Sequence, residues 1–385
     1  MTTVIHAITP GDHFSPRTGS AIPTVVHGLA SAAARDVPPW PQAVVVDRST
    51  MRPRYDSAEP IEYDSAPWLT RNERGLDLVR ARLGGVRRGT ARFFTPVADA
   101  IRAREPSIVL AHNAPVLPWL LRDSPHQVIL YAHNDLLRTY TRAEAGRALA
   151  GVAAIVCVSD SLADRTRAAL PPALADQVHV VPNGVDAVQF SPAGDDAPPR
   201  PPGKPLRIMF VGRMIAEKGP DVLVEAAARL QRPDLEFVIV GSRGFARDAP
   251  LSAFERELRR TAQDSGADIR FEPFVDRMSL PDLLRSADAL VVPSRWAEPS
   301  GLTASEGLAT GLPVIASRIG GLPDVVGDAG ILVAPDDPAT LADAIAALAD
   351  DPAERARRAA ASRAYALAHD WSWSWARLRR VLEEL

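Results

Sequence analysis

The stretch that decides the fold reads Ala-Leu-Val-Val-Pro at 289–293, followed by Glu-Pro-Ser-Gly-Leu-Thr at 298–303. The first segment is an unbroken apolar run, which is typical of a parallel strand buried on both faces and ended by proline. Pro299 and Gly301 then bend the chain, and the following amides are placed to open a helix. Ligands in open α/β sheets bind at such strand ends, so we expect the principal binding site of the chain here.

This corner combines an anion site with two carboxylates. The first N–H groups of a helix have no partner inside the helix and bind anions. Glu298 precedes this site, and Glu306 lies about one turn inside the helix. A diphosphate joined to two polyhydroxyl groups fits, because carboxylates accept hydrogen bonds from paired hydroxyls. The alternative is two ordinary acidic side chains near a helix N-terminus, where such residues are favoured anyway.

A second anion feature begins the same half of the chain. Phe-Val-Gly-Arg at 210–213 ends a predicted strand, and Glu-Lys-Gly at 217–219 precedes a predicted helix. Gly212 gives access to the backbone, while Arg213 and Lys218 can both bind a phosphate. For either cation alone a solvated loop is the better interpretation, but their combination with the Glu298 corner favours a binding site.

Composition excludes several classes of protein. The chain has 385 residues, of which 46% are hydrophobic, so it can bury the cores of two domains. A net charge of -3 argues against a nucleic-acid partner. The single cysteine, Cys157, lies in an apolar run, which predicts a buried strand position and excludes a disulfide framework. We find no basic leader segment and no uncharged apolar span of about 18 residues, and we expect a soluble cytoplasmic protein.

The organisation indicates two α/β domains. Residues 191–205 contain five prolines within eight positions and read as a linker. Short β-rich runs alternate with helical patterns on both sides, which predicts parallel sheets. Expected strands in the first half are 4–8, 43–47, 108–112, 127–133, 154–158 and 179–181. Those in the second half are 207–211, 237–240, 269–271, 289–292, 314–316 and 331–333. We therefore expect two doubly wound, Rossmann-like sheets that face a shared cleft.

These motifs together resemble family 4 glycosyltransferases. The resemblance rests on the segments quoted above and on Gly-Leu-Pro-Val-Ile-Ala-Ser at 311–317, Gly-Gly at 320–321 and Gly-Ile-Leu-Val at 330–333. It extends weakly into the first half, through Val-Ser-Asp at 158–160 and Val-Pro-Asn-Gly-Val-Asp at 181–186. Segments 111–115 and 133–135 also loosely resemble spore-coat polysaccharide glycosyltransferases. No single motif is specific, but the ordered set is.

The resemblance implies the GT-B fold and a separate role for each of its domains. Residues 1–190 would bind the acceptor, 206–368 the nucleotide sugar, and 369–385 would form a terminal helix that packs back on the first domain. The tryptophans of Trp-Ser-Trp-Ser-Trp at 371–375 would bury there. The resemblance further implies a retaining hexosyltransferase. We expect no cofactor and no metal, because the chain has no Asp-x-Asp triplet and no acid and histidine cluster with metal-like spacing.

The resemblance also assigns roles to residues. Arg213 and Lys218 would bind the diphosphate, Glu306 the ribose hydroxyls, and Glu298 the hydroxyls of the transferred sugar. Further donor-binding candidates are Gly212, Gly241, Val275, Ser300, Gly301, Leu302 and Thr303. His133, at the end of a strand in the first half, matches a histidine beside the donor sugar, and with Glu298, Arg213 and Lys218 it completes the catalytic candidates.

Acceptor candidates are less constrained by the sequence. His112 and Asn113 end the preceding strand, and His112 either shapes the acceptor pocket or only caps its strand. Gly19 and Ser20 lie in a turn after the first strand that matches a ligand-approaching loop, although a plain turn fits equally well.

The expected partners are a nucleotide-sugar donor and a small-molecule or glycan acceptor, with no nucleic acid, and the protein is expected to be a monomer or homodimer. Arginines between 71 and 104 offer a membrane-binding face, but a solvated helix face is the interpretation we favour. The alternative function is a non-catalytic nucleotide-sugar or sugar-binding protein. A dehydrogenase is disfavoured, because no Gly-x-Gly-x-x-Gly turn follows the first strand.

Overall fold

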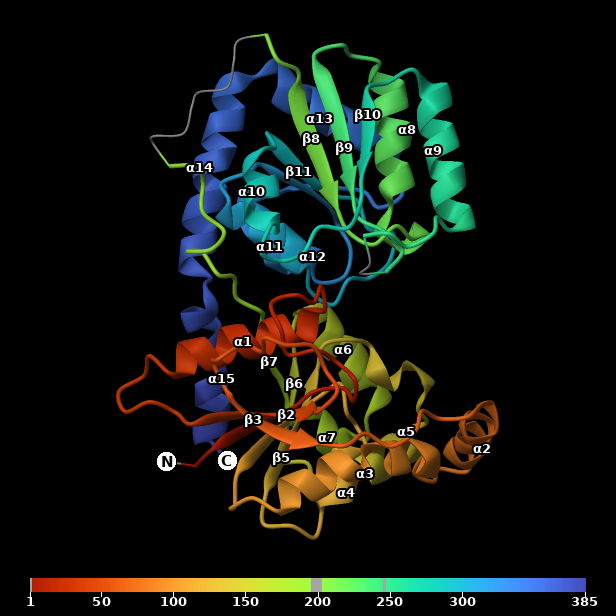
Figure 1. Cartoon of the computed structure of the whole chain (residues 1–385), viewed down its shortest axis with the longest axis vertical. Coiled ribbons are helices and arrows are strands. Elements are labelled where there is room, and N and C mark those ends of the chain that lie inside the picture. The colour runs from red at the N-terminus through yellow and green to blue at the C-terminus, as the bar shows by residue number, and fades with distance from the viewer. Residues whose placement is uncertain (1, 195–202, 245–246) are drawn as a thin grey trace. The chain divides into compact units, whose positions relative to one another are not determined.

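The structure is a computed structural model that describes residues 2–194, 203–244 and 247–385. The chain divides into an N-terminal unit, residues 1–184 with 371–385, and a C-terminal unit, residues 185–370 (Figure 1). Of the predicted linker at 191–205, residues 195–202 lie outside the described residues.

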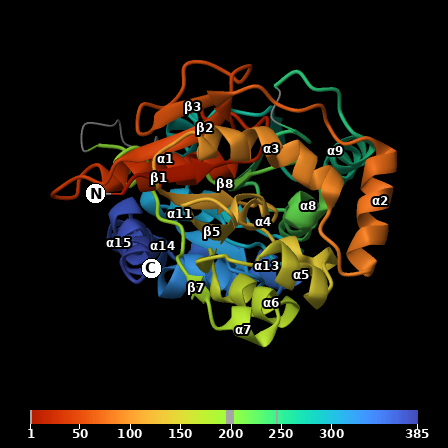
Figure 2. The ribbon, with the colours of Figure 1, turned by 90° about the horizontal axis from the view of Figure 1, so that it is seen from below.

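The described part of the N-terminal unit contains a seven-stranded parallel sheet in the order β3-β2-β1-β4-β5-β6-β7, which runs down the view in Figure 2. The strands are β1 (Val4–Ala7), β2 (Gln42–Asp47), β3 (Glu59–Tyr63), β4 (Ile108–His112), β5 (Gln127–Ala132), β6 (Ala154–Cys157) and β7 (Val178–Val180). Its helices are α1 (Ala21–Ala33), α2 (Arg71–Arg82), α3 (Arg88–Arg102), α4 (Leu117–Leu121), α5 (Arg142–Ala148), α6 (Asp160–Ala169), α7 (Pro172–Ala175) and α15 (Trp371–Glu383), with the 3₁₀ turn η1 (Leu136–Thr139).

Alternation along the strands divides the core of this unit into two layers. Val44 and Val46 of β2 pack with α1, whereas Ala43 and Val45 pack with α3. Successive side chains of a strand point to opposite faces, so α1 and α3 cover opposite faces of the sheet (Figure 1). Both faces are buried, which explains the nearly continuous apolar composition of these strands.

The described part of the C-terminal unit contains a six-stranded parallel sheet in the order β10-β9-β8-β11-β12-β13. Its strands are β8 (Leu206–Val211), β9 (Leu235–Val240), β10 (Ile269–Glu272), β11 (Ala289–Val292), β12 (Val314–Ser317) and β13 (Ile331–Val333). Its helices are α8 (Pro220–Leu230), α9 (Ala253–Ser265), α10 (Leu280–Arg285), α11 (Leu302–Ala309), α12 (Leu322–Val326), α13 (Pro338–Asp350) and α14 (Pro352–Ala368), with the 3₁₀ turns η2 (Ala216–Lys218) and η3 (Gly327–Ala329).

The last helix, α15, belongs to the N-terminal unit and packs on α1. Trp375 is buried, and its indole Nε1 donates to Asp36 Oδ2 at 2.7 Å. Trp371 lies against Gly28 of α1, where a Cβ would stand 2.2 Å from the indole ring. The returning terminal helix implied by the family resemblance is therefore present, and the predicted pair of doubly wound parallel sheets is confirmed.

One strand was missed, and several strand ends differ by one or two residues. β3 reads Glu-Pro-Ile-Glu-Tyr and lies at an edge of the sheet, where proline is tolerated because one side of the strand has no ladder to complete. Its polar composition hides it from a search for apolar runs. β5 ends at Ala132 and β6 at Cys157, so His133 and Val158, which we had placed inside strands, lie just beyond the strand ends.

Candidate active site

The strand-to-helix corner forms in the C-terminal unit as the sequence indicates. β11 ends at Val292, and α11 begins at Leu302 with Gly301 at its N-cap position. No side chain caps this helix, so its first N–H groups are free of a side-chain acceptor. β8, which carries the Gly212 and Arg213 loop, is the neighbour of β11 in the sheet. The two predicted anion features therefore lie at the same side of the sheet, where the carboxyl ends of β8 and β11 are located.

Lys218 and Glu298 form an ion pair at this side of the sheet. Lys218 Nζ lies 2.5 Å from Glu298 Oε1, and the Ser294 hydroxyl donates to the same oxygen at 2.7 Å. Glu298 is 5% exposed, so a carboxylate without these partners would be costly to bury. The cation assigned to the diphosphate and the carboxylate assigned to the sugar are thus in contact. We had predicted no role for Ser294, although Pro293-Ser294 belongs to the motifs that carry the family resemblance.

Glu306 is paired with an arginine that we did not predict. Arg277 Nη1 lies 2.6 Å from Glu306 Oε1, and Glu306 is 3% exposed. Burial raises the pKa of Glu306, and the charge of Arg277 opposes that rise. Arg277 follows the predicted nucleotide residue Val275 by two positions, and only this proximity could have suggested it.

The other donor candidates vary in exposure. Arg213 is exposed and makes no ion pair with any described residue, so its guanidinium is available to a ligand. Gly241 has φ 141°, and a Cβ there would lie 1.9 Å from the Gly212 carbonyl oxygen, which explains why position 241 needs glycine. Ser300 is buried, whereas Gly301, Leu302, Thr303 and Val275 are partly exposed.

The N-terminal unit carries a row of three stacked histidines. His112 ends β4 and His133 follows β5; His112 Nδ1 lies 2.7 Å from His133 Nε2. His6 of β1 continues the row, with His6 Nδ1 2.9 Å from His112 Nε2. His6 was missed, although a histidine inside an otherwise apolar strand is a visible signal. His112 is completely buried and bonds to both of its neighbours in the row.

Burial keeps these three rings neutral. It lowers the pKa of His6 to about 4 and that of His133 to about 3, and it lowers the pKa of His112 well below its ordinary value. The positive form of each ring would have to exist without water and beside another imidazole.

The remaining acceptor candidates are held locally. Asn113 has φ 52°, and its Oδ1 accepts from the His133 backbone N–H at 2.8 Å, so Asn113 fixes the backbone of the neighbouring strand end. Ser20 is the N-cap residue of α1 but donates its hydroxyl to Asp12 Oδ2 at 3.1 Å. Gly19 is exposed. The structure brings His112, Asn113 and His133 together, and no hydrogen bond within the described part of the chain joins these side chains to Ser20.

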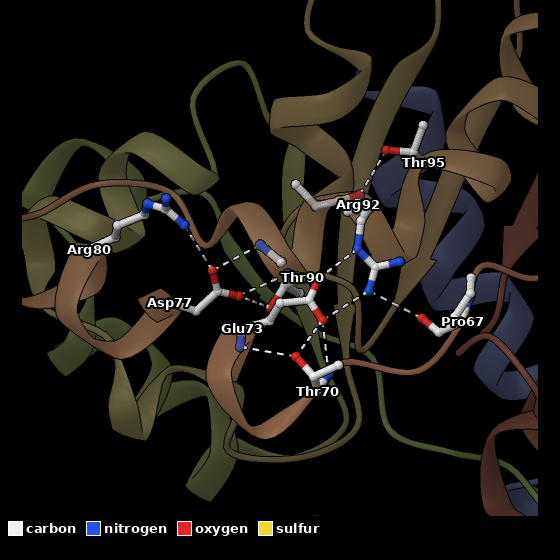
Figure 3. Close-up of polar contacts among 10 residues, drawn as sticks. Pro67, Thr70, Glu73, Asp77, Arg80, Thr90, Arg92 and Thr95 are labelled. Atoms are coloured by element: carbon white, nitrogen blue, oxygen red, sulfur yellow. Dashed lines mark hydrogen bonds and ion pairs between the residues drawn. The ribbon is translucent and has the colours of Figure 1, made fainter. Parts of the chain in front are cut away.

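Several arginines between 71 and 104 have intramolecular partners. Arg92 pairs with Glu73 at 2.8 Å, and Arg80 approaches Asp77 at 3.9 Å, as Figure 3 shows for α2 and α3. Arg87 pairs with the buried Glu144 at 2.6 Å. Arg92 and Arg87 therefore connect different helices of the N-terminal unit, whereas Arg80 and Asp77 lie on the same helix, and Arg82 is exposed.

The described residues contain no group of three or more histidine, cysteine or acidic side chains arranged to hold a metal ion. None of the helices described is both long enough and apolar enough to cross a membrane.

Comparison with solved structures shows the fold class: two parallel α/β units of this kind are typical of the GT-B fold. The structure of Anabaena HepE in complex with UDP and glucose matches over all of both chains, with a TM-score of 0.73 at 17% identity. Sucrose-phosphate synthase from Thermosynechococcus elongatus matches 99% of this chain and 98% of that chain, with a TM-score of 0.76 at 21% identity.

The sequence then gives the family. Residues 195–365 match the family described as "Glycosyl transferases group 1", and residues 24–189 match "Glycosyltransferase Family 4". Glycogen synthase from Mycobacterium tuberculosis is 33% identical over 78% of this chain and 71% of the relative. The chain belongs to glycosyltransferase family 4.

Another relative matches less of its own length. A D-inositol 3-phosphate glycosyltransferase from Catenulispora acidiphila is 38% identical over 59% of this chain and 57% of the relative. The chain thus spans little more than half of that protein.

Proposed function

We propose that the protein transfers a hexosyl group from a nucleoside diphosphate sugar to an acceptor hydroxyl, with retention of the anomeric configuration and without a divalent metal. The observation that carries this proposal is the pairing of Lys218 with buried Glu298 beside the uncapped N-terminus of α11. A cation and free helix amides suit a diphosphate, and a buried carboxylate suits sugar hydroxyls.

Each donor residue has a role in this proposal. Arg213, Lys218 and the first amides of α11 bind the diphosphate, Glu298 accepts from hydroxyls of the transferred sugar, and Glu306 accepts from the ribose. Gly212, Gly241 and Val275 approach the nucleoside, and Ser300 to Thr303 line the sugar. Arg277 donates to the buried Glu306 and orients it.

The reaction breaks the bond between C1 of the sugar and the diphosphate oxygen, and both electrons of that bond stay with the diphosphate. Arg213, Lys218 and the helix amides stabilise this developing charge. The acceptor oxygen then bonds to C1 on the face that the leaving group vacates. Its proton passes to an oxygen of the departing phosphate, so no protein side chain is required as the general base.

We use the relatives to propose which donor and which acceptor should be tested. Because HepE is named as a complex with UDP and with UDP-glucose, a UDP-sugar is the first donor to test. Relatives named for inositol phosphate and glycogen favour a polyhydroxyl acceptor, either a small metabolite or a glycan, which the N-terminal unit would bind.

Thermal shifts with UDP-, GDP- and ADP-sugars test the donor site, since a ligand that binds only the folded state raises the melting temperature. We expect one nucleotide class to stabilise the protein, and Arg213→Ala and Glu306→Ala each to abolish that shift. Turnover of the stabilising donor separates the transferase from a non-catalytic binding protein. Full activity with a chelator present is expected, and complete loss would contradict metal independence.

A further inference from the structure

A glutamine and the three histidines form a diagonal row across neighbouring strands of the N-terminal sheet. Gln42 of β2 is in register with Val4, His6 of β1 with Leu110, and His112 of β4 with Tyr131. Each member therefore lies two residues further toward the carboxyl end than the one before. Side chains two residues apart share a face of a strand, so Gln42, His6, His112 and His133 all lie on one face.

Hydrogen bonds connect the whole row. Gln42 Oε1 lies 2.9 Å from His6 Nε2, and the row continues through the His6–His112 contact at 2.9 Å and the His112–His133 contact at 2.7 Å. At its other end, Gln42 Nε2 donates to the Trp40 carbonyl at 3.2 Å. This last bond orients the amide, because a carbonyl oxygen can only accept.

The orientation of Gln42 sets the position of every proton in the row. Gln42 Oε1 is an acceptor, so His6 must donate from Nε2, and its neutral ring then has a lone pair at Nδ1. His112 must therefore donate from Nε2 to His6 Nδ1. By the same rule His133 donates from Nε2 to His112 Nδ1.

The opposite direction of donation leaves two acceptors facing each other. If His133 carried its proton on Nδ1, its Nε2 would accept from His112, and His112 would accept from His6. His6 Nε2 would then meet Gln42 Oε1 with a lone pair on each atom. Rotating the Gln42 amide moves the same conflict to the Trp40 carbonyl, and two buried acceptors that face each other without a proton are unfavourable. Only one direction satisfies all the groups.

The outward atom of the row is Nδ1 of His133. His6 and His112 are completely buried, whereas His133 keeps 8% of its surface exposed. Nδ1 of His133 has no hydrogen-bond partner among the described residues. We propose that Gln42, His6 and His112 are positioning residues that fix His133 with its proton on Nε2, so that Nδ1 accepts a hydrogen bond from a substrate hydroxyl. This inference rests on the proposed transferase function.

The tautomer can be measured without any substrate. In the full chain labelled with ¹⁵N-histidine, long-range ¹H–¹⁵N correlation spectra distinguish protonation on Nε2 from protonation on Nδ1, and a His133→Asn variant assigns the signal. At pH 7.5 we expect His133 to be neutral and protonated on Nε2. Protonation on Nδ1, or a charged ring, would overturn the proposal.

A variant then tests whether the row of side chains determines the tautomer of His133. Gln42→Leu removes the acceptor that sets the direction, so a mixture of His133 tautomers is expected. The rate of UDP release from UDP-glucose, as kcat/KM, should fall about three- to tenfold, the equivalent of one hydrogen bond. Gln127→Leu removes an exposed glutamine from β5 of the same sheet. This control should change neither the His133 tautomer nor kcat/KM.

The outcomes separate the two proposals. An unchanged tautomer in Gln42→Leu would show that the row does not control His133, and a changed tautomer with unchanged kcat/KM would show that Nδ1 does not contact substrate. Absence of UDP release from the wild-type protein, with the expected tautomer present, would instead contradict the transferase function and with it the substrate contact of Nδ1.

Discussion

Lys218 Nζ lies 2.5 Å from Glu298 Oε1, although the two residues are 80 positions apart in the chain. The contact joins the loop after β8 to the loop after β11, which are neighbouring strands. In this ion pair each side chain neutralises the charge of the other. A diphosphate that binds Lys218 would compete for this contact and leave Glu298 to accept from sugar hydroxyls, so the pair couples the two halves of the proposed donor site.

Replacing Lys218 with methionine should therefore impair both functions of the pair. Lys218→Met removes a cation from the leaving group and leaves Glu298 buried with only the Ser294 hydroxyl. We expect kcat/KM for the donor to fall roughly 100-fold or more, the effect of losing one stabilising group of the transition state. Lys204→Met, at an exposed position, is the matched control. Equal activity of the two variants would contradict the role of Lys218.

Gly219, next to Lys218, should be intolerant of alanine for a local reason. Its φ is 69°, and a Cβ there would lie 2.0 Å from the Pro293 carbonyl oxygen. Gly266 has a similar φ of 71° with open space around it, so Gly266→Ala carries only the cost of positive φ, roughly 1–2 kcal/mol. Gly219→Ala should destabilise more in urea titrations and also weaken the donor-induced thermal shift. Equal losses in the two variants would show that the contact with Pro293 is unimportant.

The sequence was sufficient for the fold and for part of the site. Unbroken apolar runs with proline or glycine ends located the buried strands, and the Glu298 corner was predicted with the helix at the right place. β3 was missed because an edge strand needs no apolar run. Arg277 and His6 were missed because their hydrogen-bond partners lie 29 and 106 positions away in the chain. Local patterns predict elements, but only tertiary pairing determines which polar side chain meets which.

Arg277→Met tests whether the Glu306 pair is structural as well as functional. Only 13% of the Arg277 side chain and 4% of the Glu306 side chain are exposed, and removing one member of a buried pair costs about 3–5 kcal/mol. Without the guanidinium the pKa of Glu306 should rise further, because burial then acts unopposed. We expect lower stability in urea and loss of the nucleotide-induced thermal shift. Arg260→Met, at an exposed ion pair, should retain both, and an unaffected Arg277→Met would contradict the assignment.

Asp77 should contribute to stability without any role in the donor site. It is 3% exposed and accepts from the backbone N–H groups of Gly89 and Thr90 at 2.9 Å, at the start of α3 (Figure 3). Asp77→Asn loses a charged acceptor for these N–H groups, and we expect a loss of about 1–2 kcal/mol, as for a helix cap. Asp99→Asn, in an exposed pair with Arg102, should cost far less. A donor-induced thermal shift that disappears in Asp77→Asn would contradict a purely structural role.

The buried histidines should make stability depend on pH in a defined window. Burial lowers the pKa of His6 from 6.5 to about 4 and that of His133 to about 3. Between these values and 6.5 the unfolded chain binds protons that the folded chain does not, so the free energy of unfolding falls as the pH is lowered. The stabilisation is complete above pH 6.5 and is lost progressively toward pH 4. For His6 alone the loss is on the order of 3 kcal/mol.

Urea titrations at pH 7.5, 6.5 and 5.5 measure this dependence. In His6→Leu the slope of unfolding free energy against pH should be shallower than in the wild-type protein, because one proton fewer is taken up on unfolding. His179→Leu replaces a partly exposed histidine of β7 and should keep the wild-type slope. Parallel slopes for wild type and His6→Leu would mean that His6 titrates in the folded chain as it does in the unfolded one. The conclusion that the three buried histidines are neutral would then be wrong.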